Sequence, residues 1–250
     1  MKAIYDNEAI LFLSRYFLQY NKVIPSSPER NFIMNTPFTF KHTQPTNMDP
    51  NRKYPAIFLL HGMGSNEDDL PQLVQDFKEQ CHIFSLRGPI TQKPGYAFFT
   101  IQDIGKPDRE VFDKVLVALQ RFVLEAIDEY QIDPHKVYML GFSQGAVLAQ
   151  SLAFAMGNLI TGIVALSGYT PKFVTEEYAI RPINHLHAFI SHGDYDYVIP
   201  SQWGVESKEI FEQFGATVTF KQYPDGHGVT PENLRDLTAF LAQELQDNIQ

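Results

Sequence analysis

The stretch that decides the fold is Lys136–Met156, KVYMLGFSQGAVLAQSLAFAM. Val137–Leu140 is a short apolar run typical of a buried parallel strand, and the residues from Ala146 onward favour a helix. Between these two elements lies Gly141-Phe142-Ser143-Gln144-Gly145, the pattern G-x-S-x-G. This pattern predicts a sharp turn that presents the serine hydroxyl, because the flanking glycines let the strand and the helix approach each other closely.

Ser143 is therefore the candidate nucleophile of an acyl-transfer reaction. The helix behind it directs backbone N–H groups and a positive dipole end at the space where an oxyanion would form. We expect one oxyanion donor to be the backbone N–H of Gln144. The second is expected to be the backbone N–H of Met63, which lies in a glycine-rich turn after the apolar run Tyr54–Leu60.

Strands alternate with helices along the rest of the chain. The strands are predicted at 54–60, 82–86, 137–140, 160–166, 186–191 and 218–222, and the helices at 68–77, 110–130, after Gly145, from Ser201 and from Thr230 as N-cap. Phe32–Met34 and Phe38–Lys41 could form two antiparallel edge strands. The alternation predicts an α/β fold with a mostly parallel central sheet and helices on both faces.

Two further residues follow strands at the carboxyl edge of this sheet, where parallel sheets place their sites. His227 comes after the last strand and can act as the base that a serine nucleophile requires, since the usual histidine pKa is about 6.5. Asp196 comes after the preceding strand and can fix the histidine tautomer. Asp194 is a competitor for this role. His61, at the end of an earlier strand, is interpreted as a structural hydrogen-bonding residue.

The substrate pocket is predicted less directly. A long connection after the second predicted core strand contains Tyr96, Phe98, Phe99 and Ile101, and aromatic residues there could line an acyl pocket or pack in the core. We take Phe98 and Phe99 as pocket candidates. Trp203, on a later predicted helix, is assigned to the core rather than to the pocket.

Composition excludes several other classes of protein. The chain has 250 residues, 44% of them hydrophobic, which is enough to bury one large core. A net charge of -9 without any Lys/Arg cluster argues against nucleic acid or an anionic membrane as a partner. No stable membrane insertion is expected, because no apolar run is long enough. The single cysteine and the absence of a signal-peptide pattern predict a cytoplasmic protein.

The first part of the chain is predicted to be an extension. Residues 1–30 precede the expected catalytic domain, 31–250, and a helix from Glu8 to Tyr20 has an apolar stripe. This stripe could pack on the catalytic domain, cover the site as a lid, or contact a second copy in a homodimer.

The motifs together resemble the phospholipase/carboxylesterase family of α/β-hydrolases, which includes acyl-protein thioesterases and small bacterial carboxylesterases. The resemblance extends from about residue 38 to the end. It rests on Leu60-His61-Gly62-Met63-Gly64, Arg87-Gly88-Pro89, Gly141–Ala146, Leu166-Ser167-Gly168, His192–Asp196 with Pro200, and Gly226-His227. By this resemblance, Ser143, Asp196 and His227 match the catalytic triad, and Met63 and Gln144 match the oxyanion hole.

The expected activity is that of a serine carboxylesterase acting on small-molecule esters through an acyl-enzyme intermediate, without a metal or organic cofactor. An acyl-protein thioesterase or a lysophospholipase would use the same three residues. A catalytically silent ligand-binding module on the same fold is the alternative from a different class.

Overall fold

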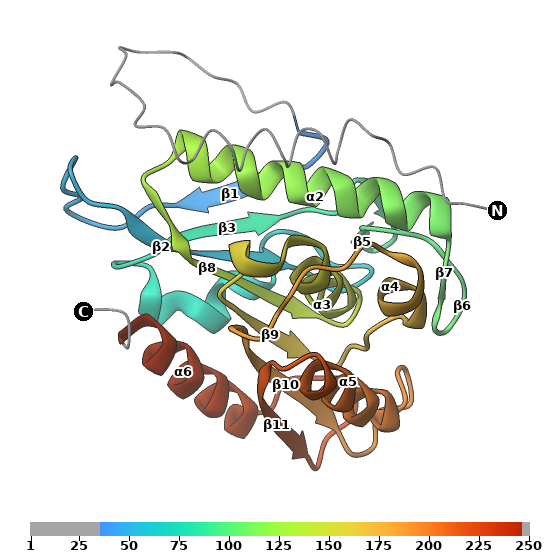
Figure 1. Cartoon of the computed structure of the whole chain (residues 1–250). Coiled ribbons are helices and arrows are strands. Elements are labelled where there is room, and N and C mark those ends of the chain that lie inside the picture. Colours follow the sequence, from blue (N-terminus) through green and yellow to red (C-terminus); the bar gives the residue numbers. More distant parts are fainter. Residues whose placement is uncertain (1–35, 247–250) are drawn as a thin grey trace. The chain divides into compact units, whose positions relative to one another are not determined.

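A seven-stranded sheet organises residues 36–246, the part of the chain that the computed structural model describes (Figure 1). Its strand order is β1-β3-β2-β8-β9-β10-β11, with β1 antiparallel to β3 and every other pairing parallel. The seven strands are β1 (Phe40–Thr43), β2 (Tyr54–Leu60), β3 (His82–Leu86), β8 (Ile132–Phe142), β9 (Gly162–Leu166), β10 (His187–Gly193) and β11 (Thr217–Tyr223). The predicted fold class, a mostly parallel sheet of the α/β-hydrolase type, is confirmed.

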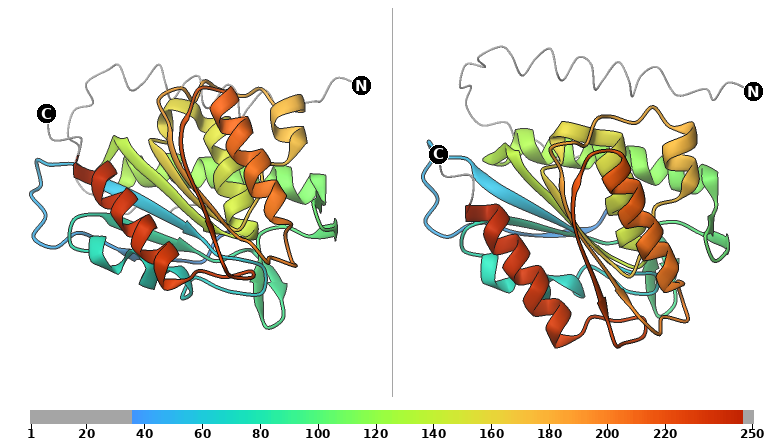
Figure 2. Two further views of the ribbon diagram at one scale, coloured as in Figure 1. Left: turned by 90° about the horizontal axis from the view of Figure 1, so that it is seen from below. Right: turned by 60° about the horizontal axis from the view of Figure 1, so that its bottom comes forward.

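Helices cover both faces of this sheet (Figures 1 and 2). One face carries α2, α3 and α5, and the other carries η1 and α6. The bounds of the helices are η1 (Leu70–Phe77), α2 (Arg109–Glu129), α3 (Gln144–Met156), η2 (Gly157–Leu159), α4 (Lys172–Glu177), α5 (Ser201–Gln213) and α6 (Pro231–Gln246). Two small hairpins, β4 (Ile90–Gln92) with β5 (Gly95–Ala97) and β6 (Ile101–Asp103) with β7 (Lys106–Pro107), follow β3.

The central strand β2 shows why the core strands are apolar without interruption. Its Ile57 and Leu59 join the cluster that η1 and α6 cover. Phe58 points to the other face, where its ring stacks on Phe84 at 5.0 Å and meets the edge of Phe122 on α2. Because successive side chains of a strand point to opposite faces, a sheet covered on both sides requires apolar residues at every position.

Several predicted boundaries differ from the structure. The helix predicted at 68–77 is instead η1, a 3-10 segment interrupted at Val74, whose φ of -122° is not helical. The predicted edge strand Phe38–Lys41 lies two residues later, as β1, and Phe38 itself packs on the rings of Phe98 and Phe122. The strand before Ser143 begins earlier than predicted, at Ile132, because this residue pairs with the start of β2.

Other predictions fall on residues that the structure does not describe. The helix predicted from Glu8 to Tyr20, the edge strand Phe32–Met34 and the boundary between residues 30 and 31 lie outside residues 36–246. Within that described range, no helix combines the length and the apolar character needed to cross a bilayer.

Candidate active site

Ser143 lies at a tight turn between β8 and α3. Its backbone has φ 53° and ψ -116°, a conformation that costs energy for a residue with a side chain. The flanking glycines are required by close contacts: a Cβ on Gly141 would lie 2.2 Å from the Gly145 carbonyl oxygen, and one on Gly145 would lie 1.8 Å from the Leu60 carbonyl oxygen. The predicted sharp turn is present, and the reason is the close approach of β8, α3 and β2.

Three side chains from separate loops form one hydrogen-bonded chain. His227 Nε2 lies 2.8 Å from Ser143 Oγ, and His227 Nδ1 lies 2.7 Å from Asp196 Oδ2. The residues follow β8, β10 and β11, so the carboxyl edge of the sheet brings them together. Because a carboxylate only accepts, the imidazole Nδ1–H donates to Asp196, and Nε2 can then accept the serine proton.

The Asp196 carboxylate is held by several donors. Its side chain has no exposed surface, and Oδ1 accepts hydrogen bonds from the backbone N–H groups of Val198 and Ile199, at 2.8 and 2.9 Å. Burial raises the pKa of Asp196, but the hydrogen bonds from His227 and the two backbone groups outweigh it and hold that pKa below its usual value. The competitor Asp194 is exposed, so the structure places Asp196 and not Asp194 beside the imidazole.

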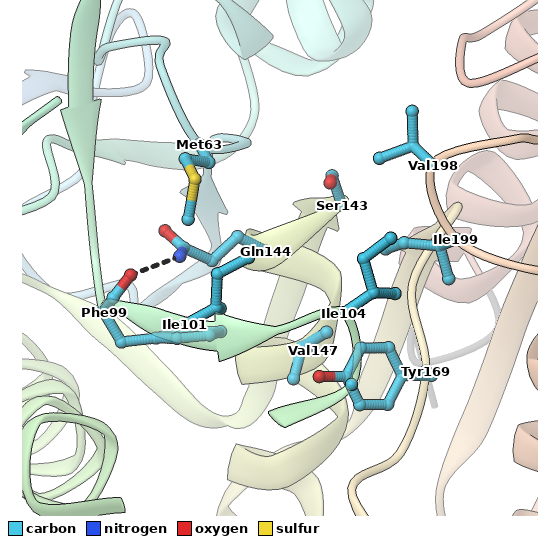
Figure 3. A pocket seen from close by; sticks show the side chains of 11 residues that line it. Met63, Phe99, Ile101, Ile104, Ser143, Gln144, Val147, Tyr169, Val198 and Ile199 are labelled. Atoms are coloured by element: carbon cyan, nitrogen blue, oxygen red, sulfur yellow. Dashed lines mark hydrogen bonds between the residues drawn. The ribbon is translucent and has the colours of Figure 1, made fainter. Parts of the chain in front are cut away.

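The two expected oxyanion donors lie close to the nucleophile. Met63 and Gln144 both line the pocket that also contains Ser143 (Figure 3). Gln144 is the first residue of α3, where backbone N–H groups have no partner within the helix. Its side chain has a role that the sequence did not indicate. The amide oxygen accepts from Phe98 N–H and the amide nitrogen donates to the Phe99 carbonyl, each at 2.6 Å, which ties α3 to the loop that carries the pocket wall.

His61 and Arg87 brace the neighbouring loops. The buried His61 donates from Nδ1 to the Gly62 carbonyl at 2.7 Å and accepts at Nε2 from Gly88 N–H at 3.0 Å. Arg87 forms a two-pronged ion pair with the buried Glu67 and stacks on the ring of Tyr96. His61 is therefore a structural hydrogen-bonding residue, as predicted.

An apolar pocket opens beside Ser143 and encloses about 490 Å³, including the part open to solvent. The lining residues are Met63, Phe99, Ile101, Ile104, Gly105, Ser143, Gln144, Val147, Tyr169, Val198 and Ile199 (Figure 3). Phe99 was expected here, but the assignment of Phe98 to the pocket is wrong. The Phe98 ring is fully buried between Phe38 and His61, because neighbouring residues of this loop point in opposite directions.

Trp203 is outside the pocket lining, as predicted, but it is not fully buried in the core. Its side chain is half-buried and lies behind the pocket wall, with its ring 5.0 Å from that of Tyr169. A Cβ on Gly105 would lie 2.5 Å from the Trp203 ring, so glycine lets the β6–β7 hairpin come close to it. Val198 and Ile199 were missed as pocket residues, although their position directly after Asp196 was an available signal.

The sheet, the turn at Ser143 and the chain of Ser143, His227 and Asp196 define an α/β-hydrolase with the geometry of a serine-hydrolase site. The family model of phospholipases and carboxylesterases matches residues 46–245, and the chain belongs to this family. The family inferred from the motifs is thereby confirmed, and the protein is classed as a hydrolase.

Individual relatives agree with this assignment. Acyl-protein thioesterase 1 of Candida albicans is 31% identical over 208 residues, which cover 74% of this chain and 90% of that protein. Acyl-protein thioesterase 1 of Saccharomyces cerevisiae is 32% identical over 215 residues, covering 76% of this chain and 92% of that protein. The crystal structure of the Bacillus cereus carboxylesterase is similar with a TM-score of 0.75 and 26% identity, covering 84% of this chain and 96% of that one.

Proposed function

We propose that the protein is a serine carboxylesterase that hydrolyses carboxylic esters through an acyl-enzyme intermediate. The observation that carries the proposal is the hydrogen-bonded chain from Ser143 through His227 to Asp196, next to an apolar pocket. A serine hydroxyl is a weak nucleophile at neutral pH and needs an adjacent base, and this geometry supplies one.

In the first half-reaction, Ser143 Oγ attacks the ester carbonyl carbon while its proton passes to His227 Nε2. The backbone N–H groups of Met63 and Gln144 stabilise the negative carbonyl oxygen. The bond to the alcohol oxygen then breaks, and that oxygen takes the proton from the imidazolium. Asp196 remains ionised and stabilises the positive imidazolium throughout.

In the second half-reaction, water attacks the acyl carbon of the ester formed with Ser143. Its proton passes to His227 Nε2, and the tetrahedral oxyanion uses the same two backbone donors. The bond to Ser143 Oγ then breaks, Oγ regains the proton, and the carboxylic acid is released.

A fluorophosphonate probe tests the proposal, because it labels only a serine that is activated as a nucleophile. Wild type should be labelled at Ser143 and should hydrolyse 4-nitrophenyl esters, and Ser143→Ala should do neither. A loss of about 10⁶-fold in kcat is expected by comparison with other triads. Labelling of a different serine, or near-normal turnover by Ser143→Ala, would contradict the mechanism. A wild type that binds esters without turnover would instead be the silent binding module.

A thioesterase or lysophospholipase activity is the second candidate, and the similarity to two acyl-protein thioesterases favours it. The same triad cleaves thioesters by the same steps, so only substrate preference distinguishes the two candidate activities. Short-chain oxygen esters, long-chain acyl thioesters and lysophospholipids should be compared by kcat/KM in direct competition. A strong preference for long acyl thioesters would replace the carboxylesterase assignment.

A further inference from the structure

The polar side chains that line the pocket differ in their hydrogen-bond partners. The Ser143 hydroxyl is paired with His227. Both polar atoms of the Gln144 amide are used by the backbone of the Phe98–Phe99 loop. The remaining hydroxyl belongs to Tyr169, for which no hydrogen bond is present among residues 36–246. This hydroxyl is therefore the side-chain donor in the pocket that the fold itself does not use.

Tyr169 is held in place by its ring rather than by its hydroxyl. It follows Ser167-Gly168 at the carboxyl end of β9, and its ring packs edge-on against Trp203. Figure 3 shows the ring beside Val147 and Ile104, within the pocket wall. A phenylalanine would provide the same ring packing. The packing contacts therefore do not account for the hydroxyl.

The charge of the surroundings restricts what the hydroxyl could bind. Burial raises the pKa of Tyr169 to about 12, so the group stays protonated and able to donate at neutral pH. No Asp, Glu, Lys, Arg or His is among the residues that line the pocket. A charged ligand would lose its hydration there without gaining an opposite charge. A neutral oxygen acceptor costs less free energy to desolvate, and a hydrogen bond from the hydroxyl can replace the one it loses to water.

We propose that the Tyr169 hydroxyl is a specificity contact that donates a hydrogen bond to a neutral oxygen on the substrate group occupying this pocket. The preferred esters then carry an ether, keto or hydroxyl oxygen in that group rather than a plain hydrocarbon chain. This inference rests on the proposed esterase function. It adds a substrate class to the site, because an apolar pocket without a donor would not discriminate between the two kinds of chain.

Isosteric substrates test the inference. In one series, 4-nitrophenyl hexanoate is compared with esters in which an oxygen replaces one methylene of the acyl chain at successive positions. In a second series, butyl acetate is compared with 2-methoxyethyl acetate, which places the oxygen in the alcohol part. The measured quantity is the ratio of kcat/KM for the oxygen-bearing ester to that for its hydrocarbon partner, which removes changes common to both substrates.

Tyr169→Phe should lower this ratio about three- to tenfold for at least one oxygen position, the usual net value of one hydrogen bond. The inherent reactivity of each ester is the same for both enzymes, so it does not affect the comparison. Tyr197→Phe is the matched control, because Tyr197 is 92% exposed and outside the pocket lining. Its ratios should equal those of wild type.

Thermal melting should show that all three proteins are folded. Equal ratios for wild type and Tyr169→Phe in both series would overturn the inference while leaving the esterase function intact. A wild type that hydrolyses no ester of either series would overturn the proposed function, and the inference with it.

Discussion

Two hydrogen-bonded histidine sites lie at different places on the same sheet and differ in the charge of the histidine's partner. At the carboxyl edge, His227 bonds to the buried carboxylate of Asp196. At the β1–β3 edge, His42 Nε2 lies 3.0 Å from His82 Nδ1, and the His42 ring stacks on Phe84. The first imidazole has an anionic partner, and the second has only a neutral ring.

The difference shows that burial and hydrogen bonding do not alone make a histidine suitable for proton transfer. Burial lowers the pKa of both His42 and His82 to about 4, so the pair stays neutral at physiological pH. The Asp196 carboxylate, in contrast, can balance the positive charge when His227 accepts a proton. We therefore expect chemistry at the first site and only a contribution to stability at the second.

The largest effect is expected from replacing the two types of histidine in turn. His227→Ala removes the base and should reduce kcat for a 4-nitrophenyl ester by about 10⁶-fold. His42→Phe keeps an aromatic ring for stacking at the β1–β3 edge and should leave kcat/KM within about twofold of the wild-type value. Steady-state kinetics at pH 7.5 check both variants. A His227→Ala variant that retains a tenth of the wild-type rate, or a His42→Phe variant that loses as much activity as His227→Ala, would contradict the assignment of proton transfer to His227 alone.

The next largest effect is expected from replacing Asp196, and replacing Asp194 in the same loop should have almost none. Asp196→Asn should reduce kcat about 10⁴-fold, because an amide does not hold the imidazole in the tautomer with a proton on Nδ1. Asp194→Asn is the matched control and should change kcat by less than about threefold, because this side chain is exposed and His227 does not bond to it. Equal losses in both variants would show that the loop, rather than the Asp196 carboxylate, supports the reaction.

The smallest effect concerns the stability of the β1–β3 edge in acid. In the unfolded chain His82 takes up a proton near pH 6.5, whereas in the folded protein its pKa is about 4. The unfolded state therefore binds more protons between these values, so the free energy of unfolding falls as the pH falls from 6.5 to 4. The expected slope is up to about 1.4 kcal/mol per pH unit for one proton.

Urea unfolding at a series of pH values measures this slope. His82→Phe should show a shallower decrease than wild type, while its kcat/KM at pH 7.5 stays within about twofold of wild type because the residue is far from Ser143 in the sheet. Parallel slopes for the two proteins would mean that other groups control acid unfolding and that the β1–β3 histidines do not titrate as described.

Much of the fold and the three candidate catalytic residues could be predicted because their signals are local. A continuous apolar run marks a covered strand, and β2 and β3 have the predicted bounds. Glycines two residues before and after Ser143 mark the turn. His227 and Asp196 each follow a strand, and parallel strands bring such positions to one edge. The resemblance to the phospholipase/carboxylesterase family then matched Ser143, Asp196 and His227 to the catalytic triad.

The pocket could not be predicted in the same way, since its wall is assembled from segments that lie far apart in the chain: the turn at Met63, residues 99–105, the start of α3, Tyr169, and Val198 with Ile199. Phe98 and Phe99 are neighbours of one chemical type, yet one ring is sealed against Phe38 and the other faces the cavity. Tyr169 faces the cavity because Trp203, thirty-four positions later in the chain, lies behind it. Outside regular helices and strands no period fixes the direction of a side chain, so contacts between distant segments decide it.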